Sequence, residues 1–214
     1  PACNVELATS ALTAFLREKT QKVGFQKAVL GLSGGIDSAL VVEVAARALG
    51  GENVLAVAMP YRTSNPISLE LGQESAQHAG VRFEVVDISD MADAHMATSP
   101  GLAEDDSDAA RLRKGNIMAR CRMIVLYDRS ARDHALFYGT SNKTELMLGY
   151  GTIFGDMASA LNPIGDLYKS QIVALSKHLG VPKGIVDRPP SADLWQGQTD
   201  EEELGFSYDE VDAF

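Results

Sequence analysis

Short apolar runs and longer stretches of helical periodicity alternate along the chain. The apolar runs predict strands at residues 28–32, 54–59, 81–86 and 135–138. Apolar positions at helical spacing predict helices at residues 5–22, 38–49, 67–79, 108–129, 144–148 and 169–179. Strands that are apolar at successive positions, rather than at alternate ones, are typical of a parallel sheet buried on both faces. We therefore expect an α/β fold, a doubly wound parallel sheet with helices on both faces.

Length, charge and cysteine content narrow the class of protein. A chain of 214 residues suits one domain, or one domain with an appendage. The formal net charge of −10 argues against a broad nucleic-acid surface, which would be basic. No apolar run approaches the roughly 18 residues of a membrane span, and the first residues do not resemble a secretory signal. Cys3 and Cys121 match no metal spacing, so we expect reduced thiols in a cytoplasmic protein.

The stretch VLGLSGGIDSAL, residues 29–40, contains three glycines and two serines at the end of the first predicted strand and in the residues that follow it. It lacks the dinucleotide fingerprint, because Ser33 stands where the second glycine would be, and it lacks the Gly-Lys pair of a Walker loop. Three interpretations compete: a phosphate-binding loop, the G-x-S-x-G elbow of a serine α/β-hydrolase, and a plain glycine turn. A hydrolase needs an oxyanion loop from an earlier strand. Only a helix is predicted before the strand at residues 28–32, which disfavours the hydrolase interpretation.

A phosphate-binding loop accounts for every residue of the stretch. Glycines let backbone N–H groups approach an anion, and the start of the following helix carries partial positive charge. Ser33 and Ser38 add hydroxyl donors, which a plain turn would not explain. The carboxylate of Asp37 would repel phosphate unless a divalent cation lay between them. Asp37 thus implies magnesium, which binds carboxylate and phosphate oxygens together.

A second polar motif, GTSNKTE at residues 139–145, follows the fourth predicted strand. Ligands of doubly wound sheets bind at the carboxyl ends of the strands, so this motif is a second candidate part of the site. Asn142 and Glu145 also have the spacing of a helix capping box, and a purely structural role stays open.

Several motifs, in one order, resemble a known family. Residues 33–38, SGGIDS, resemble the S-G-G-x-D-S loop of the N-type ATP pyrophosphatase superfamily. The stretches that resemble the ammonia-dependent NAD synthetases of that superfamily are residues 114–116 with Arg120, 139–145, 154–158, 162–169, and 189–194 through 201–205. The resemblance runs from about residue 29 to residue 214.

This resemblance implies an adenine nucleotide alpha hydrolase-like fold and a specific reaction. Such enzymes use ATP to adenylylate the nicotinate carboxylate of deamido-NAD. Ammonia then displaces AMP to give NAD, with pyrophosphate as the other product. Adenylylation is needed because a carboxylate is a poor electrophile without a good leaving group. Negative charge develops on pyrophosphate, so catalysis is expected to depend on positioning and on stabilisation by cations.

The resemblance also implies residue roles. The residues expected to bind ATP are Gly31, Leu32, Ser33, Gly34, Gly35, Ile36, Asp37, Ser38, Thr140, Lys169 and Ser191. Asp37 and Glu145 are expected to bind magnesium, and Arg120 to contact deamido-NAD. Asp156 is expected near the ammonia, where a carboxylate attracts ammonium and takes a proton, and to act with Lys169 in catalysis.

Structural alternatives stay open for three of these residues. Lys169 could be a solvated lysine at the start of a helix. Arg120 could pair with Asp128 or Glu145. Asp156 could cap a turn.

The same resemblance implies an organisation and partners. We expect a single domain over residues 1–214, with an N-terminal helix in residues 1–24 at a homodimer contact and a mobile lid and tail in residues 186–214. The helix near residues 117–126 is expected to share that contact. The chain has no room for the amidase domain of glutamine-dependent relatives, so the expected nitrogen source is free ammonia or ammonia from a separate supplying enzyme. Ile153 replaces a lysine that touches substrate in some members.

Two other functions stay open. A tRNA-thiolating pyrophosphatase of the same superfamily would be expected to have a basic face and catalytic cysteines, which the net charge and the isolated Cys121 disfavour. A non-catalytic nucleotide-binding module would be expected to lack the metal carboxylates, yet Asp37 and Glu145 are both present.

Overall fold

Four parallel strands form one sheet in the computed structural model, which describes residues 3–189 and Gly205. The strands are β1 (Lys27–Gly31), β2 (Val54–Ala58), β3 (Arg82–Val85) and β4 (Ala135–Tyr138), and their order is β3-β2-β1-β4. In the central strand β1, Val29 pairs with Leu55 of β2 on one side and with Phe137 of β4 on the other. All three of these residues are buried, as expected for strands covered on both faces. The predicted parallel sheet is confirmed.

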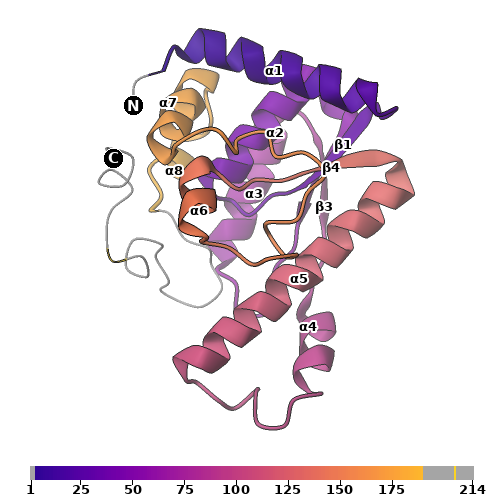
Figure 1. Cartoon of the computed structure of the whole chain (residues 1–214), viewed down its shortest axis with the longest axis vertical. Coiled ribbons are helices and arrows are strands. Elements are labelled where there is room, and N and C mark those ends of the chain that lie inside the picture. Colours follow the sequence, from indigo (N-terminus) through magenta and orange to yellow (C-terminus); the bar gives the residue numbers. More distant parts are fainter. Residues whose placement is uncertain (1–2, 190–204, 206–214) are drawn as a thin grey trace.

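Helices cover both faces of this sheet (Figure 1). The helices on one face are α1 (Val5–Lys22), α2 (Ile36–Leu49), α3 (Pro66–Ala79), α7 (Lys169–Leu179) and α8 (Lys183–Val186). The helices on the other face are α4 (Ser89–Met96) and the long α5 (Asp108–Asp133). The short α6 (Lys143–Leu148) follows β4. Each face therefore has its own apolar core, with the sheet between the two. None of the described helices is long and apolar enough to span a membrane.

Most observed elements lie close to the predicted ones, and the differences have local causes. Helix α2 begins at Ile36 rather than at Ser38, so that Asp37 lies in its first turn. Helix α5 continues to Asp133 rather than ending at Arg129, and it stops where His134 takes a left-handed conformation. The sequence does not predict α4, α8 or the 3-10 helix η1 (Gly51–Asn53). These elements are short, and α4 is largely polar, so their apolar periodicity is weak.

The strand order places two strand ends side by side that are far apart in the sequence. From β1 the chain moves outward to β2 and then to β3, and α5 carries it back across the sheet to β4 on the opposite side of β1. In doubly wound sheets, ligands bind where the strand order reverses in this way. Here that point lies between β1 and β4. The two candidate loops that follow these strands are therefore neighbours.

A buried pair of hydroxyl groups fixes α1 to the end of β4. Thr20 and Tyr138 are fully buried, and their side-chain oxygens form a short hydrogen bond. Burial raises the pKa of Tyr138, and the hydrogen bond with Thr20 partly opposes this rise. Tyr138 is the last residue of β4, so the bond anchors the strand end from which the second candidate loop begins.

Replacing Tyr138 with phenylalanine leaves the Thr20 hydroxyl buried without its partner. We expect Tyr138→Phe to lower the free energy of unfolding by about 1–2 kcal/mol, the cost of one unpaired buried hydroxyl. The double variant Thr20→Val/Tyr138→Phe should recover part of this loss, because it removes both polar groups. Urea denaturation followed by circular dichroism measures these values. Additive losses in the double variant would contradict the pairing.

Candidate active site

A cavity of about 820 Å³ opens above the carboxyl ends of the strands. Its walls come from the loops after β1, β2 and β4, from the first turn of α3, from the middle of α5 and from residues 149–156. Small-molecule sites usually occupy roughly 300–1,000 Å³, so a nucleotide fits this space. The predicted loops after β1 and β4 both line the cavity.

The loop after β1 is shaped by its glycines and serines. Gly34 has a φ of +79°, and a Cβ atom there would lie 2.3 Å from the carbonyl oxygen of Ser68 in α3, so only glycine fits. The Ser38 hydroxyl donates to the carbonyl oxygen of Gly35 (3.0 Å) and accepts the backbone N–H of Ser33 (3.2 Å). The Ser33 hydroxyl accepts the backbone N–H of Gly35 (3.2 Å). Both serines thus brace the loop.

Helix α2 begins at the cavity without a side-chain cap. Its N-cap is Gly35, and no side chain hydrogen-bonds there to the first-turn N–H groups. Gly35, Ile36 and Asp37 all line the cavity. The unpaired N–H groups of a helix start, together with the helix dipole, attract anions. The loop and the start of α2 therefore form a site suited to phosphate.

Asn142 joins the two strand-end loops. Its side-chain N–H donates to Oδ1 of Asp37 (3.1 Å), and its side-chain oxygen accepts the backbone N–H of Glu145 (2.9 Å). The backbone N–H of Asn142 also donates to Oε2 of Glu145 (3.1 Å). Asn142 is fully buried, so Asp37 and Glu145 lie on either side of one fixed amide. The capping-box alternative is confirmed, and Glu145 lines the cavity as well.

Lys169 forms an ion pair inside this site. Its ammonium donates to Oδ2 of Asp37 at 2.5 Å, and the residue is only 5% exposed. The alternative of a solvated lysine at a helix start is therefore wrong, although Lys169 is indeed the first residue of α7. A buried ion pair is tolerated when further hydrogen bonds satisfy its partners, and Asn142 supplies one to Asp37.

Asp37 and Glu145 fit a magnesium ion that is held jointly with phosphate. Among the residues that the structure describes, no cluster of three or more His, Cys, Asp or Glu side chains could hold a metal ion. Magnesium commonly takes one or two carboxylates and completes its shell with water and phosphate oxygens. Two carboxylates beside a phosphate-binding loop match that donor set.

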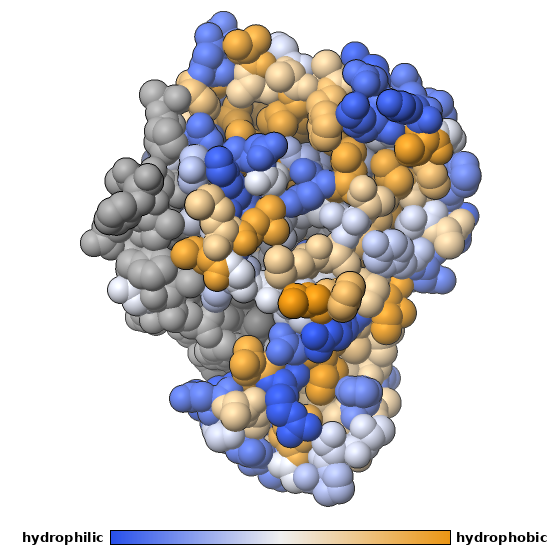
Figure 2. Space-filling view, in the orientation of Figure 1, coloured by the Kyte–Doolittle hydropathy of each residue, from blue (hydrophilic) through white to orange (hydrophobic). Residues whose placement is uncertain are grey.

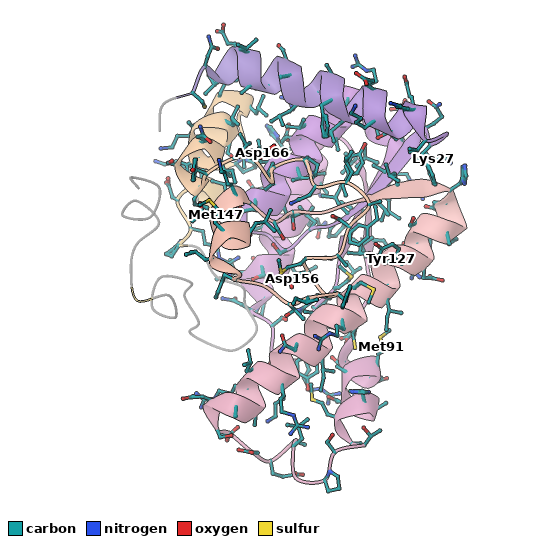
Figure 3. The ribbon with its side chains drawn as sticks, in the orientation of Figure 1. Lys27, Met91, Tyr127, Met147, Asp156 and Asp166 are labelled. Carbon is teal, nitrogen blue, oxygen red and sulfur yellow. The ribbon has the colours of Figure 1, made fainter. Side chains whose placement is uncertain are left out.

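Asp156 lies on the cavity wall formed by residues 149–156. Its Oδ1 accepts the backbone N–H of Thr152 at 2.7 Å, so the turn-cap alternative is confirmed. The residue is nevertheless exposed, and it lines the cavity. Figure 3 labels it in the region between α5 and α6. A structural contact and a place at the ligand therefore coexist at Asp156.

Of two predicted ligand contacts, Thr140 lines the cavity and Arg120 does not. Thr140, which follows β4 closely, lines the cavity. Arg120 is not among the described residues that line it: it is exposed on α5, and its guanidinium donates to the carbonyl oxygen of Ile153 (3.2 Å). The alternative pairing of Arg120 with Asp128 or Glu145 is wrong, since Asp128 pairs instead with its neighbour on α5.

The cavity contains cations that the sequence analysis missed. Arg62, Arg122 and Arg188 line it, and Arg188 donates to the hydroxyl of Ser68 (2.9 Å). Arg62 follows β2, so the rule that ligands gather at strand ends could have found it. Arg122 and Arg188 carry no such signal, because each lies in or after a helix. Ser191 lies outside the described residues.

Two ionisable groups at the β2–β3 end of the cavity have shifted pKa values. Burial, reinforced by the Asp93 carboxylate, raises the pKa of Tyr61. Hydrogen bonds from Ser89 lower the pKa of Asp87. At neutral pH this end of the cavity therefore presents a neutral phenol and an ionised carboxylate.

Helix α5 and the loop of residues 149–158 together form an apolar surface next to the cavity. We define this α5 surface by its members, Ile124, Tyr127, Ile153, Phe154 and Met157. The last four line a second hollow of about 370 Å³. Ile153 and Phe154 are 62% and 74% exposed, and Ile124 and Tyr127 of α5 are exposed as well. Figure 2 shows apolar side chains beside α5 and over α6. Contiguous exposed apolar side chains mark interaction sites.

Comparison with known sequences gives the following matches. The chain matches the model of the NAD synthase family over residues 8–214. It is 59% identical over 206 residues to the NH(3)-dependent NAD(+) synthetase of Chlorobaculum tepidum, which covers 96% of this chain and 72% of the relative. It is 51% identical over 209 residues to the enzyme of the same name from Fusobacterium nucleatum, which covers 98% of this chain and 78% of the relative.

Solved structures give a consistent result. An NMN synthetase from Francisella tularensis superposes with a TM-score of 0.91 at 33% identity, covering 100% of this chain and 86% of the other. An NH3-dependent NAD synthetase from Campylobacter jejuni, in complex with the nitrate ion, superposes with a TM-score of 0.79 at 43% identity. That match covers 86% of this chain and 77% of the other.

Replacing Gly34 with alanine forces a side chain against the backbone of α3. We expect Gly34→Ala to weaken the binding of ATP by about tenfold or more, because overpacking and positive-φ strain both displace the loop. Isothermal titration calorimetry measures the affinity. The matched control is Gly24→Ala, since Gly24 has a φ of +88° with open space around it. Equal losses of ATP affinity in both variants would argue against the close contact with Ser68.

Proposed function

The chain belongs to the NAD synthase family and has ammonia-dependent NAD synthetase activity, and we propose how its own residues perform that reaction. The observation that carries the proposal is the pair of carboxylates, Asp37 and Glu145, held together by the buried Asn142 at the edge of a phosphate-binding loop. A nucleotide triphosphate bound there would meet both acidic groups and the ammonium of Lys169.

We propose that residues 31–38, Thr140 and Lys169 bind ATP. Backbone N–H groups of the loop and the uncapped start of α2 would donate to phosphate oxygens. Asp37 and Glu145 would hold magnesium, which when bound neutralises phosphate charge and favours departure of pyrophosphate. Lys169 pairs with Asp37, so its charge lies at the end of the cavity formed by residues 31–38.

The first step joins the two substrates. A carboxylate oxygen of deamido-NAD attacks the α-phosphorus of ATP and forms a new P–O bond. The bond from the α-phosphorus to the bridging oxygen breaks, and pyrophosphate leaves with that electron pair. Lys169 would stabilise the negative charge that grows on the leaving group. The cavity surrounds this reaction on the sides formed by the strand ends and α5, which limits the access of water.

The second step forms the amide. The nitrogen of ammonia attacks the carbonyl carbon of the adenylylated nicotinate, the bond to the AMP oxygen breaks, and the nitrogen loses a proton. We propose that Asp156 attracts ammonium into the cavity, where it loses one proton to water and becomes ammonia, and that the carboxylate then accepts the proton that the nitrogen loses after attack. Its carboxylate lines the cavity and lies on a separate wall from the phosphate-binding loop.

We further propose that the protein is a homodimer in which the α5 surface is covered by a second copy. Arg120 donates to the carbonyl oxygen of Ile153, a member of that surface, and is exposed and not among the described residues that line the cavity. A partner would extend the cavity wall toward Arg120, where its guanidinium would meet a phosphate of deamido-NAD. This arrangement explains why the predicted substrate contact lies outside the cavity of a single chain.

The direct test combines the protein with ATP, magnesium and deamido-NAD, with and without ammonium. We expect AMP and NAD to form together only when ammonium is present, as measured by liquid chromatography. Asp37→Asn and Glu145→Gln should each lower turnover by about 100-fold or more, because charge stabilisation is lost. Asp108→Asn, at a fully exposed carboxylate whose partner Arg111 is not among the described residues that line the cavity, is the matched control.

Two results would contradict this assignment. Unchanged turnover in the amide variants of Asp37 or Glu145 would remove the proposed carboxylate pair. Amidation of nicotinate mononucleotide as fast as that of deamido-NAD would instead favour the activity for which the Francisella tularensis protein is named.

The dimer prediction has a separate test. Phe154→Asp places a charge in the middle of the α5 surface, and we expect it to convert the protein to a monomer. The same change should raise the KM for deamido-NAD more than the KM for ATP. Multi-angle light scattering gives the oligomeric state. Leu7→Asp serves as the control, since Leu7 is an exposed apolar residue of α1. A monomer caused by Leu7→Asp, but not by Phe154→Asp, would move the interface to the N-terminal helix.

A further inference from the structure

We propose that Asn116 and Thr152 form a positioning pair that fixes the carboxylate of Asp156 for ammonia. This inference rests on the proposed function of Asp156 and adds two residues that no part of the sequence analysis assigned a role. Asn116 belongs to α5, and Thr152 belongs to the loop that carries Asp156, so the pair connects two walls of the cavity.

A chain of two short hydrogen bonds links α5 to Asp156. The Thr152 hydroxyl donates to Oδ1 of Asn116 at 2.6 Å, across 36 positions of sequence. The backbone N–H of Thr152 donates to Oδ1 of Asp156 at 2.7 Å. Thr152 is 7% exposed, so both bonds are shielded from water at the Thr152 end. Bonds of a backbone N–H to a carboxylate are charge-assisted and stronger than neutral ones.

Only one oxygen of the Asp156 carboxylate is occupied by these contacts. No other described residue hydrogen-bonds to Asp156, and the residue lines the cavity, so in this proposal the contact with ammonium falls to Oδ2. A carboxylate held by one oxygen has a fixed orientation for the other. Ammonium offers only N–H donors, and a single oriented oxygen would both attract it and accept its proton.

The backbone around Thr152 is packed tightly against α5. A Cβ atom on Gly155 would lie 2.8 Å from Cγ2 of Thr152 and 3.0 Å from Cβ of Ala119. The backbone N–H of Gly155 donates to the carbonyl oxygen of Thr152 (2.9 Å). Packing therefore sets how closely this loop approaches α5. The hydrogen bond to Asn116 then sets the direction of the Thr152 hydroxyl.

Asp156, Thr152 and Asn116 have different roles in this proposal. Asp156 would touch ammonia, whereas Thr152 would act on Asp156 through its backbone N–H. Asn116 would act one step further away, by holding the Thr152 hydroxyl. Displacements of a reacting group by even 1 Å lower rates strongly, so loss of this support should affect the ammonia step specifically.

The test measures steady-state kinetics in Thr152→Val and Asn116→Leu, which keep the side-chain size but remove the hydrogen bond. We expect kcat/KM for ammonium to fall by about tenfold in each, the effect of losing one buried hydrogen bond of roughly 1.4 kcal/mol. The KM for ATP should stay within about twofold of its original value, because the phosphate-binding loop is untouched. Thr152→Ser keeps the hydroxyl and should restore most of the ammonium kinetics.

The double variant Thr152→Val/Asn116→Leu decides whether the two residues act as a pair. If the two residues act as a pair, the double variant has the same kcat/KM for ammonium as the single variant with the lower value, because the one hydrogen bond between them can be lost only once. Multiplied losses, equal rises in the KM for ATP and for ammonium, or unchanged kinetics in Thr152→Val would each overturn the pair. Thr98→Val, at an exposed hydroxyl that bonds within the end of α4, is the control.

Asp156→Asn separates this inference from the proposed function. Unchanged use of ammonium in Asp156→Asn would remove the proposed role of Asp156 itself. A lower kcat/KM for ammonium in Asp156→Asn, together with unchanged kinetics in Thr152→Val, would support the role of Asp156 and contradict only the positioning pair. Thermal unfolding followed by circular dichroism confirms that each variant is folded at the assay temperature.

Discussion

The buried amide of Asn142 is the contact on which the site depends. Asp37 and Glu145 are both partly buried, and a partly buried carboxylate needs hydrogen-bond donors or an opposite charge to offset its loss of water. The side-chain N–H of Asn142 donates to the Asp37 carboxylate, and its backbone N–H donates to the Glu145 carboxylate, so one residue bonds both acids. The side-chain oxygen of Asn142 accepts the backbone N–H of Glu145. Lys169 supplies the opposite charge to Asp37. The side chains that we propose to hold magnesium are thereby held in place by the protein's own hydrogen bonds and ion pair.

The charge of the cavity lining differs from the charge of the chain as a whole. The chain as a whole has a formal net charge of −10, which would repel nucleotides and discourage nonspecific contact with nucleic acid. The cavity differs, because among the described residues that line it Lys169 and three arginines balance four carboxylates, and the uncapped start of α2 adds partial positive charge. Attraction of a triphosphate is therefore local. It depends on cations gathered from α5, α7 and the segments after β2 and α8, rather than on the overall charge.

Helix α5 serves several parts of the molecule at once. One side of it packs on β1 and β4 and supports the apolar core of that face. Its middle lines the cavity and holds the loop of residues 149–158 through Asn116, Ala119 and Arg120. Ile124 and Tyr127 contribute to the α5 surface. A second copy bound to that surface would thus contact the same loop that carries Asp156, so dimer formation would act directly on the residue that we propose to bind ammonia.

The sequence by itself determined the parallel sheet, nearly every helix and strand, and the two loops that carry Asp37 and Glu145. These features have local causes: continuous apolar strands, helical periodicity, and glycines where a backbone must approach an anion. The sequence could not show that Lys169 is buried on Asp37, that Arg188 reaches the cavity, or that Thr152 and Asn116 support Asp156. Each of these contacts joins residues that are distant along the chain. The contact of Lys169 with Asp37 and that of Thr152 with Asn116 depend on the strand order, which brings β4 beside β1 and α5 across the sheet, whereas Arg188 meets Ser68 of α3 from the segment after α8. Tertiary structure decided them, since hydrogen bonds and ion pairs between distant segments depend on packing that no local pattern records.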